Sequence, residues 1–187
     1  MLAQRTQNSL AKITALDLDA DAAVQAKENA QCSPWADRID VIQQDILTFS
    51  PADHDYDLLV CNPPYFVESL TCPDPKRSMA RHTDNLDFNN LFNKAASLAS
   101  KRAEFCLILP IEHSNSVVEL GANTGWHLIE ACSVAHDAKR VPIRVLLRFA
   151  NNTPKTPTYS SHITIRNEDW SYSDDFTQLC RDFYLKM

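Results

Sequence analysis

Four consecutive residues, Asn62-Pro63-Pro64-Tyr65, form the segment whose residue types are best suited to chemistry. Proline has a fixed φ and no backbone N–H, so two prolines in a row make a rigid turn and leave carbonyl oxygens free to accept hydrogen bonds. Asn62 adds a carboxamide oxygen, and Tyr65 adds a flat ring. These groups can hold a planar NH₂ group, which donates to the Asn62 side chain and the Pro63 carbonyl while its ring stacks on Tyr65. The alternative use of this tetrad is a rigid turn with an aromatic cover.

Acidic residues follow two other predicted strands. Asp17 ends the first of these strands, where a carboxylate can accept both hydroxyls of a ribose. Asp45 can accept from an adenine amino group, and the apolar Ile46 beside it can pack on the ring. Asp after a strand is also ordinary turn chemistry. Asp19 and Asp21 are better explained as helix N-caps, because they precede an alanine-rich segment.

The elements that must position these residues alternate between short apolar segments and helical ones, which predicts an α/β fold. The predicted strands are residues 12–17, 38–43, 56–61, 104–109, 126–136, 142–149 and 162–166. The predicted helices are residues 20–31, 88–100, 111–123 and 173–185. No helix separates 126–136 from 142–149, so these two strands should form an antiparallel hairpin near the edge of a mostly parallel sheet. We expect one domain over residues 1–187, with its ligands outside the carboxyl ends of the strands.

Composition excludes several kinds of site. The chain has 2 glycines, so it contains neither a Walker loop nor a G-x-G-x-x-G loop. Its 6 cysteines form no C-x-x-C pair, which argues against zinc and redox motifs. We see no apolar run of the ~20 residues needed to cross a membrane and no apolar signal segment at the start. We therefore expect a soluble, cytoplasmic protein.

The formal net charge is −6, but two stretches contain basic residues and no acid. The first stretch covers residues 75–82 and the second covers residues 138–150. Their basic residues are Lys76, Arg77, Arg81 and His82, and Lys139, Arg140, Arg144 and Arg148. Either stretch can meet a phosphate backbone. The alternative is a solvated face that balances acidic surface elsewhere.

The order of the segments ALDLD, QQDIL and VCNPPYF resembles the class I S-adenosylmethionine-dependent amino-methyltransferases, whose hallmark is [DN]-P-P-[YF]. The segments MLAQRT, AKENAQCSPWADRI, MARHT, GWHL and RVLLRF narrow the resemblance to the bacterial tRNA adenine-N6 methyltransferases. Those enzymes modify the adenine beside the anticodon of a valine tRNA. The resemblance runs from Met1 to Phe183-Tyr184, and it implies a Rossmann-like methyltransferase sheet.

The resemblance also implies a role for each candidate residue. The cofactor, S-adenosylmethionine, would be bound by Asp17, Leu18, Asp45, Ile46 and Asn62. The target amino group would be held by the catalytic set Asn62, Pro63, Pro64 and Tyr65. The phosphates of the tRNA anticodon arm would be held by Lys76, Arg77, Arg81, Arg140 and Arg144. A base in folded RNA must be extruded to enter such a pocket. No metal and no general base are required, because the amino group is neutral and the sulfonium loses its charge on transfer.

In the family, the MLAQRT segment lies in the first helix, after a first strand and a glycine-rich loop. Neither precedes it in these residues, so the resemblance implies an N-terminally shortened member that lacks the strand between residues 12–17 and 56–61. We therefore expect the 187-residue chain to be marginally stable and to bind little cofactor. A strand and glycine-rich loop placed before Met1 should restore both properties.

Three other functions remain open from the sequence. A protein glutamine N5-methyltransferase uses the same tetrad on a side-chain amide. A DNA adenine methyltransferase would require a further domain for reading sequence. A shortened chain without cofactor would be a non-catalytic RNA-binding remnant, which calorimetry with S-adenosylmethionine would distinguish from an enzyme. The sequence indicates no oligomeric state.

Overall fold

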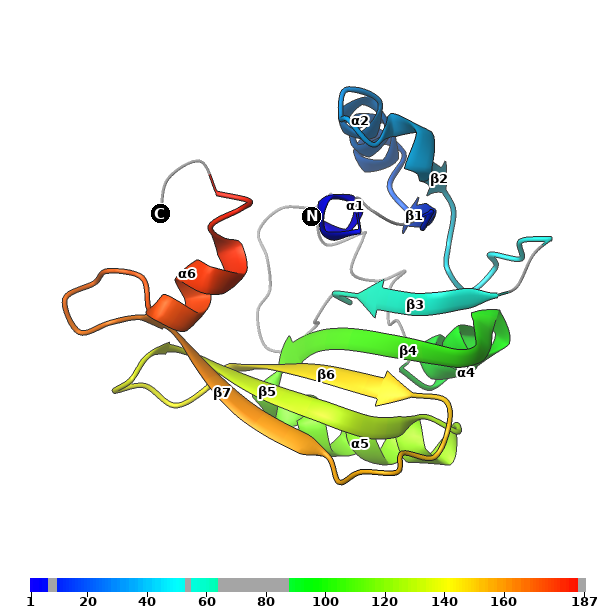
Figure 1. Cartoon of the computed structure of the whole chain (residues 1–187). Coiled ribbons are helices and arrows are strands. Elements are labelled where there is room, and N and C mark those ends of the chain that lie inside the picture. Colours follow the sequence, from blue (N-terminus) through cyan, green and yellow to red (C-terminus); the bar gives the residue numbers. More distant parts are fainter. Residues whose placement is uncertain (7–9, 53–54, 64–87, 185–187) are drawn as a thin grey trace, which may run out of the picture. The chain divides into compact units, whose positions relative to one another are not determined.

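The computed structural model describes residues 1–6, 10–52, 55–63 and 88–184 (Figure 1). The chain divides into two compact units, Met1–Ala52 and Asp53–Met187. The expectation of a single domain over residues 1–187 stays a prediction.

The first unit is built on two parallel strands. Its elements are α1 (Leu2–Arg5), β1 (Ile13–Asp17), α2 (Ala20–Gln31), the short helix η1 (Ala36–Arg38) and β2 (Ile39–Gln43). β1 and β2 pair in register from Ile13↔Ile39 to Asp17↔Gln43. α2 begins at its predicted cap, because Asp19 accepts a 2.8 Å hydrogen bond from the backbone N–H of Ala22. The predicted bounds of α2 are confirmed.

Arg38 ties the start of the chain to this unit. One of its terminal nitrogens donates to Thr6 Oγ1 at 2.7 Å, and the other donates to the Ala3 carbonyl at 3.4 Å. Its Nε donates to the Ala11 carbonyl at 2.9 Å. A single planar guanidinium therefore satisfies acceptors in α1 and in the segment before β1.

The second unit contains a five-stranded sheet in the order β3-β4-β6-β5-β7. Its strands are β3 (Tyr56–Cys61), β4 (Ala99–Pro110), β5 (His127–Asp137), β6 (Arg144–Ala150) and β7 (Tyr159–Arg166). β3 pairs parallel with β4, and β7 pairs parallel with β5, whereas β6 pairs antiparallel with both β4 and β5. The predicted hairpin is confirmed. β6 lies between β4 and β5 rather than near the edge of this sheet, because β5 and β7 extend the sheet beyond it.

The core of this unit lies between the sheet and two helices on one face, α4 (Phe88–Leu98) and α5 (Ser114–Asn123) (Figure 1). Alternate residues of β4 and β6 point into the core, as period-two strands require. The aromatic rings interlock edge to face: the Phe92 centroid lies 5.2 Å from that of Phe105 and 5.4 Å from that of Phe149. The Phe105 ring also packs against the fully buried Trp126. The last helix, α6 (Asp174–Cys180), packs against β7.

Replacing Gly121 with alanine is expected to destabilise the protein by about 1–2 kcal/mol. A Cβ at this buried position of α5 would lie 2.9 Å from Phe149 Cε1 and 3.1 Å from Phe92 Cε1. Overpacking a core costs about 1–3 kcal/mol, which outweighs the gain of up to ~1 kcal/mol that alanine brings to an open helix position. Chemical denaturation measures the change. A variant more stable than the parent would contradict this packing.

Several predicted bounds differ from the structure. The predicted helix 173–185 is α6, which ends at Cys180; Leu185 lies outside the described residues. The predicted strand 104–109 is longer, because β4 begins at Ala99, opposite Tyr56 of β3. The predicted helix 111–123 begins as the 3-10 turn η2 (Ile111–His113) before α5. Hydrogen-bond partners decide such ends, and the amino-acid pattern does not reveal them.

Candidate functional site

The two acids predicted to bind a cofactor meet at one end of the first unit. Asp17 is the last residue of β1, and Asp45 lies two residues beyond the end of β2. Because β1 and β2 are parallel, both acids lie at the carboxyl end of the pair. The N–H of Gln44 donates to the Asp17 carbonyl at 2.9 Å, which ties the segment after β2 to the end of β1.

Local backbone groups fix the orientation of both carboxylates. Asp17 Oδ1 accepts from the N–H of Asp19 at 2.9 Å, and Asp45 Oδ1 accepts from the N–H of Leu47 at 2.8 Å. The Asp45 side chain therefore forms a local turn bond, as the alternative explanation of this residue predicts. In each case the second carboxylate oxygen lies outside these bonds. Leu18 is 53% exposed and Ile46 is half-buried, so apolar surface flanks both acids.

The tetrad Asn62-Pro63-Pro64-Tyr65, which is predicted to hold the target amino group, begins at the carboxyl end of β3. Asn62 directly follows this strand and is exposed, and Pro63 is buried. Parallel pairing with β4, such as Leu59↔Phe105 and Cys61↔Leu107, holds the strand that carries them. Pro64 and Tyr65 lie outside the described residues, and Asp17 and Asp45 belong to the other unit.

Cys61 lies beside Asn62 but is unsuited to nucleophilic chemistry. Burial raises the pKa of its thiol to about 11. The thiol is therefore neutral near pH 7, and the thiolate is the reactive form of cysteine. This end of β3 places the Asn62 carboxamide next to a neutral thiol.

Ion pairs involve most cations of the second basic stretch. The stretch 138–150 has no acid of its own, but acids outside it pair with three of its four cations. The pairs are Arg148 with Glu130 at 2.8 Å and with Glu104 at 3.5 Å, Lys139 with Glu168 at 3.3 Å, and Arg140 with Asp137 at 3.3 Å. The fourth cation, Arg144, is exposed and donates to the Ile143 carbonyl at 3.2 Å. Lys76, Arg77 and Arg81 lie outside the described residues.

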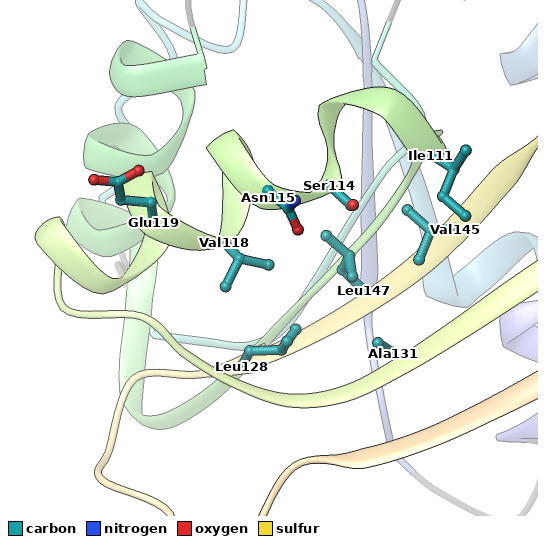
Figure 2. A pocket seen from close by; sticks show the side chains of 9 residues that line it. All are labelled: Ile111, Ser114, Asn115, Val118, Glu119, Leu128, Ala131, Val145 and Leu147. Carbon is teal, nitrogen blue, oxygen red and sulfur yellow. The ribbon is translucent and has the colours of Figure 1, made fainter.

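A pocket of about 390 Å³ lies between α5 and the sheet of the second unit (Figure 2). Val118 of α5 faces it, with Leu128 of β5 and Leu147 of β6 on the sheet side. The lining is mostly apolar, and no predicted site residue contributes to it. This pocket is therefore a gap in the packing of a helix on the sheet, and it is not part of the predicted site.

Comparisons with known proteins agree with the resemblance found in the sequence. A family profile described as "RMKL-like, methyltransferase domain" matches residues 2–140. A protein of Klebsiella pneumoniae subsp. pneumoniae, named tRNA1(Val) (adenine(37)-N6)-methyltransferase, is 40% identical over 188 residues, which cover 100% of this chain and 76% of the relative. The chain belongs to this methyltransferase family. Relatives of the same name from Tolumonas auensis and Parabacteroides distasonis are 42% and 39% identical, each over 100% of this chain and over 77% and 78% of their own length.

Solved structures show that this family member has the class I methyltransferase fold. A predicted O-methyltransferase from Agrobacterium tumefaciens superposes with a TM-score of 0.69 at 13% identity, over 91% of this chain and 77% of that one. A putative class I S-adenosylmethionine-dependent methyltransferase from Listeria monocytogenes gives a TM-score of 0.61 at 11% identity, over 87% and 53%. Identities this low show the fold alone.

Sequence reasoning missed one contact of this methyltransferase. Asp19 was expected to cap α2, which it does, but its backbone N–H also orients the Asp17 carboxylate. The spacing D-x-D was the available signal, since an Asp side chain commonly accepts from the N–H two residues on.

None of the helices among the described residues is long and apolar enough to span a membrane. The described residues also contain no group of three or more His, Cys, Asp or Glu side chains placed to share a metal ion.

Proposed function

We propose that this protein transfers a methyl group from S-adenosylmethionine to the N6 amino group of an adenine in the anticodon loop of a tRNA. The observation that carries the proposal is the Asn62-Pro63 pair at the carboxyl end of β3, in a chain that aligns over its whole length with relatives named for this activity. A cytoplasmic location follows from a tRNA substrate.

The acids of the first unit suit the nucleoside end of the cofactor. A carboxylate oxygen on Asp17 can accept from the ribose hydroxyls, and one on Asp45 can accept from the adenine amino group. Leu18 and Ile46 supply apolar surface for the adenine ring. Both carboxylates are already oriented by backbone N–H groups, which lowers the cost of binding. When bound, S-adenosylmethionine supplies an electrophilic methyl group.

The tetrad positions the amino nitrogen. The Asn62 carboxamide oxygen and the Pro63 carbonyl accept the two amino hydrogens, and Tyr65 stacks on the adenine ring. With both hydrogens held, the nitrogen lone pair turns out of conjugation with the ring and toward the methyl group. Catalysis then consists of alignment and of hydrogen bonds that strengthen as the nitrogen gains positive charge. The neutral Cys61 thiol takes no part in this step.

The test is transfer of labelled methyl to total tRNA from a bacterial strain that lacks the anticodon-loop modification, followed by nucleoside analysis. The expected product is labelled N6-methyladenosine in a valine tRNA. A peptide that contains the glutamine substrate of N5-methyltransferases serves as the competing acceptor. Label in the peptide and none in the tRNA would overturn the proposal.

Basic residues of the second unit are proposed to hold the anticodon-arm phosphates. Replacing both Arg140 and Arg144 with glutamine should weaken tRNA binding and reduce the slope of log K against log salt concentration by about 1–2 units, because each phosphate contact contributes roughly 0.7–0.9. Filter binding at several salt concentrations measures the slope. Replacing both Lys101 and Arg102 with glutamine, at two exposed positions near the start of β4, is the control of equal charge change. Equal slopes for the parent and the double variant would show that these arginines lie on a solvated face and do not contact the phosphates.

A further inference from the structure

An exposed tryptophan in a strained turn marks a second candidate contact for RNA. The turn Asn167–Tyr172 follows β7, and Trp170 within it has φ +67°. Among the described residues other than glycine, Trp170 alone has a positive φ. A bulky residue in this left-handed region costs about 1–3 kcal/mol, and such strain clusters at functional sites.

The turn is held rigidly by its own hydrogen bonds. The N–H of Asn167 donates to the Ser171 carbonyl at 2.9 Å, and the N–H of Trp170 donates to the Asn167 carbonyl at 3.1 Å. The Asn167 side chain also donates to the Tyr172 carbonyl at 3.1 Å, and Arg166 donates to the Trp170 carbonyl. Glycine or asparagine would fill this position without strain, so the turn itself gives no reason for a tryptophan.

The indole is presented to solvent rather than packed in the core. Trp170 is 65% exposed, and its ring lies edge to face with His136, with centroids 5.8 Å apart. Beside it is a pocket of about 240 Å³, whose lining includes the side chains of Arg140, Arg166 and Asn167. A pocket of this size is below the range of drug-sized ligand sites and suits one planar group.

Two of the three cations around this pocket pair with acids. Lys139 pairs with Glu168, and Arg140 pairs with Asp137, at 3.3 Å each. The third, Arg166, lies over the Tyr172 ring at 4.2 Å from its centroid. The hydrogen bond with His136 lowers the pKa of Asp137, so this acid stays ionised. The pocket offers donors and acceptors for the edge of a base, and Trp170 offers a flat ring for its face.

We propose that Trp170 is a stacking site for one unpaired nucleotide of the RNA substrate, with Arg140, Arg166 and Asn167 around the edge of the base. The proposal rests on the function proposed above and adds a contact away from the Asn62 turn. Aromatic stacking on a single base is sequence-tolerant and contributes much of the affinity for single-stranded RNA. Because β3 and β7 are opposite edges of the sheet, this site would recognise an unpaired base several nucleotides away from the modified adenine.

The decisive variant is Trp170→Gly, because it removes the ring and relieves the strained φ together. The fold should be as stable as the parent or more stable, whereas the dissociation constant for an unmodified anticodon stem-loop should rise about 10-fold. The salt dependence of binding should not change, in contrast to the Arg140 and Arg144 variant. Trp170→Phe, which keeps a ring, should bind within about threefold of the parent.

Fluorescence gives an independent readout in a Trp35→Phe background. The two tryptophans left are Trp170, which is exposed, and Trp126, which is fully buried, so RNA should quench the Trp170 signal.

Tyr159→Ala is the control for the affinity measurement, since this ring is 64% exposed at the opposite end of β7, roughly 23 Å away along the strand. It should leave RNA affinity unchanged.

Three outcomes would overturn the proposal. If Trp170→Gly binds the stem-loop as the parent does, the ring serves another partner, such as a protein, and the proposed function still stands. If Trp170→Gly unfolds at a lower temperature and loses binding together with stability, the ring has a structural role. If the parent chain binds no tRNA, the proposed function fails and the stacking site fails with it.

Discussion

Replacing Asn62 with alanine is expected to lower methyl transfer about 100-fold or more, while cofactor affinity changes much less. The Asn62 carboxamide is proposed to accept a hydrogen bond that strengthens as the target nitrogen becomes positive. Removing one such preorganised partner typically costs 10²–10³ in rate. Single-turnover transfer to tRNA measures the rate, and calorimetry with S-adenosylhomocysteine measures the affinity, both in the version extended by a strand and a glycine-rich loop before Met1.

The matched control for Asn62 is Asn123→Ala, which removes the same side chain from the exposed end of α5. It should leave both quantities unchanged. An Asn62→Ala variant that transfers methyl at the parental rate would show that the residue only forms a turn. A variant that loses cofactor affinity in proportion to its rate would place Asn62 in cofactor binding instead.

Replacing Asp17 with alanine should weaken cofactor binding by about 10- to 100-fold. A charged acceptor contributes about 1.5–3 kcal/mol to a hydrogen bond, and each 1.4 kcal/mol is a tenfold change in affinity. Transfer at saturating cofactor should fall much less, since Asp17 is proposed to touch the ribose and not the reacting atoms. Calorimetric titration with S-adenosylhomocysteine checks the affinity.

Asp19→Ala separates this role from a structural one. It removes the N-cap of α2, at a cost of about 1 kcal/mol in stability, but it keeps the backbone N–H that orients Asp17. Cofactor affinity should therefore stay near the parental value while the melting temperature falls. Equal losses of cofactor affinity in the two variants would contradict the proposal that Asp17 binds the cofactor ribose.

Much of the secondary structure could be predicted because its signals are local. The helix at Ala20–Gln31 has a capping Asp before it and an alanine-rich interior, and the strand at Tyr56–Cys61 ends directly before the Asn-Pro-Pro sequence. Helix ends at His113 and Cys180 were missed, since tertiary contacts and backbone partners decide them.

The candidate site was predictable to the extent that strand ends define it. Asp17 ends a strand, Asp45 and Asn62 follow strands, and all three lie at carboxyl ends of parallel pairs. The roles of these residues stay proposals until the variants are measured. The neutral state of Cys61 could not be read from the sequence, because burial of its thiol depends on how β3 packs.

The sequence by itself determined the α/β alternation, the tetrad Asn62-Pro63-Pro64-Tyr65 and the family, because each depends on residues that are close together in the sequence. Only the tertiary structure decided which basic side chains pair with acids. The partners of Arg148 and Lys139 are Glu104, Glu130 and Glu168, which come from other elements of the chain. It also decided that Trp170 is exposed in a strained turn, since φ and exposure follow from how β7 ends. Charge pairing and side-chain exposure arise from contacts between distant segments, and no local pattern records them.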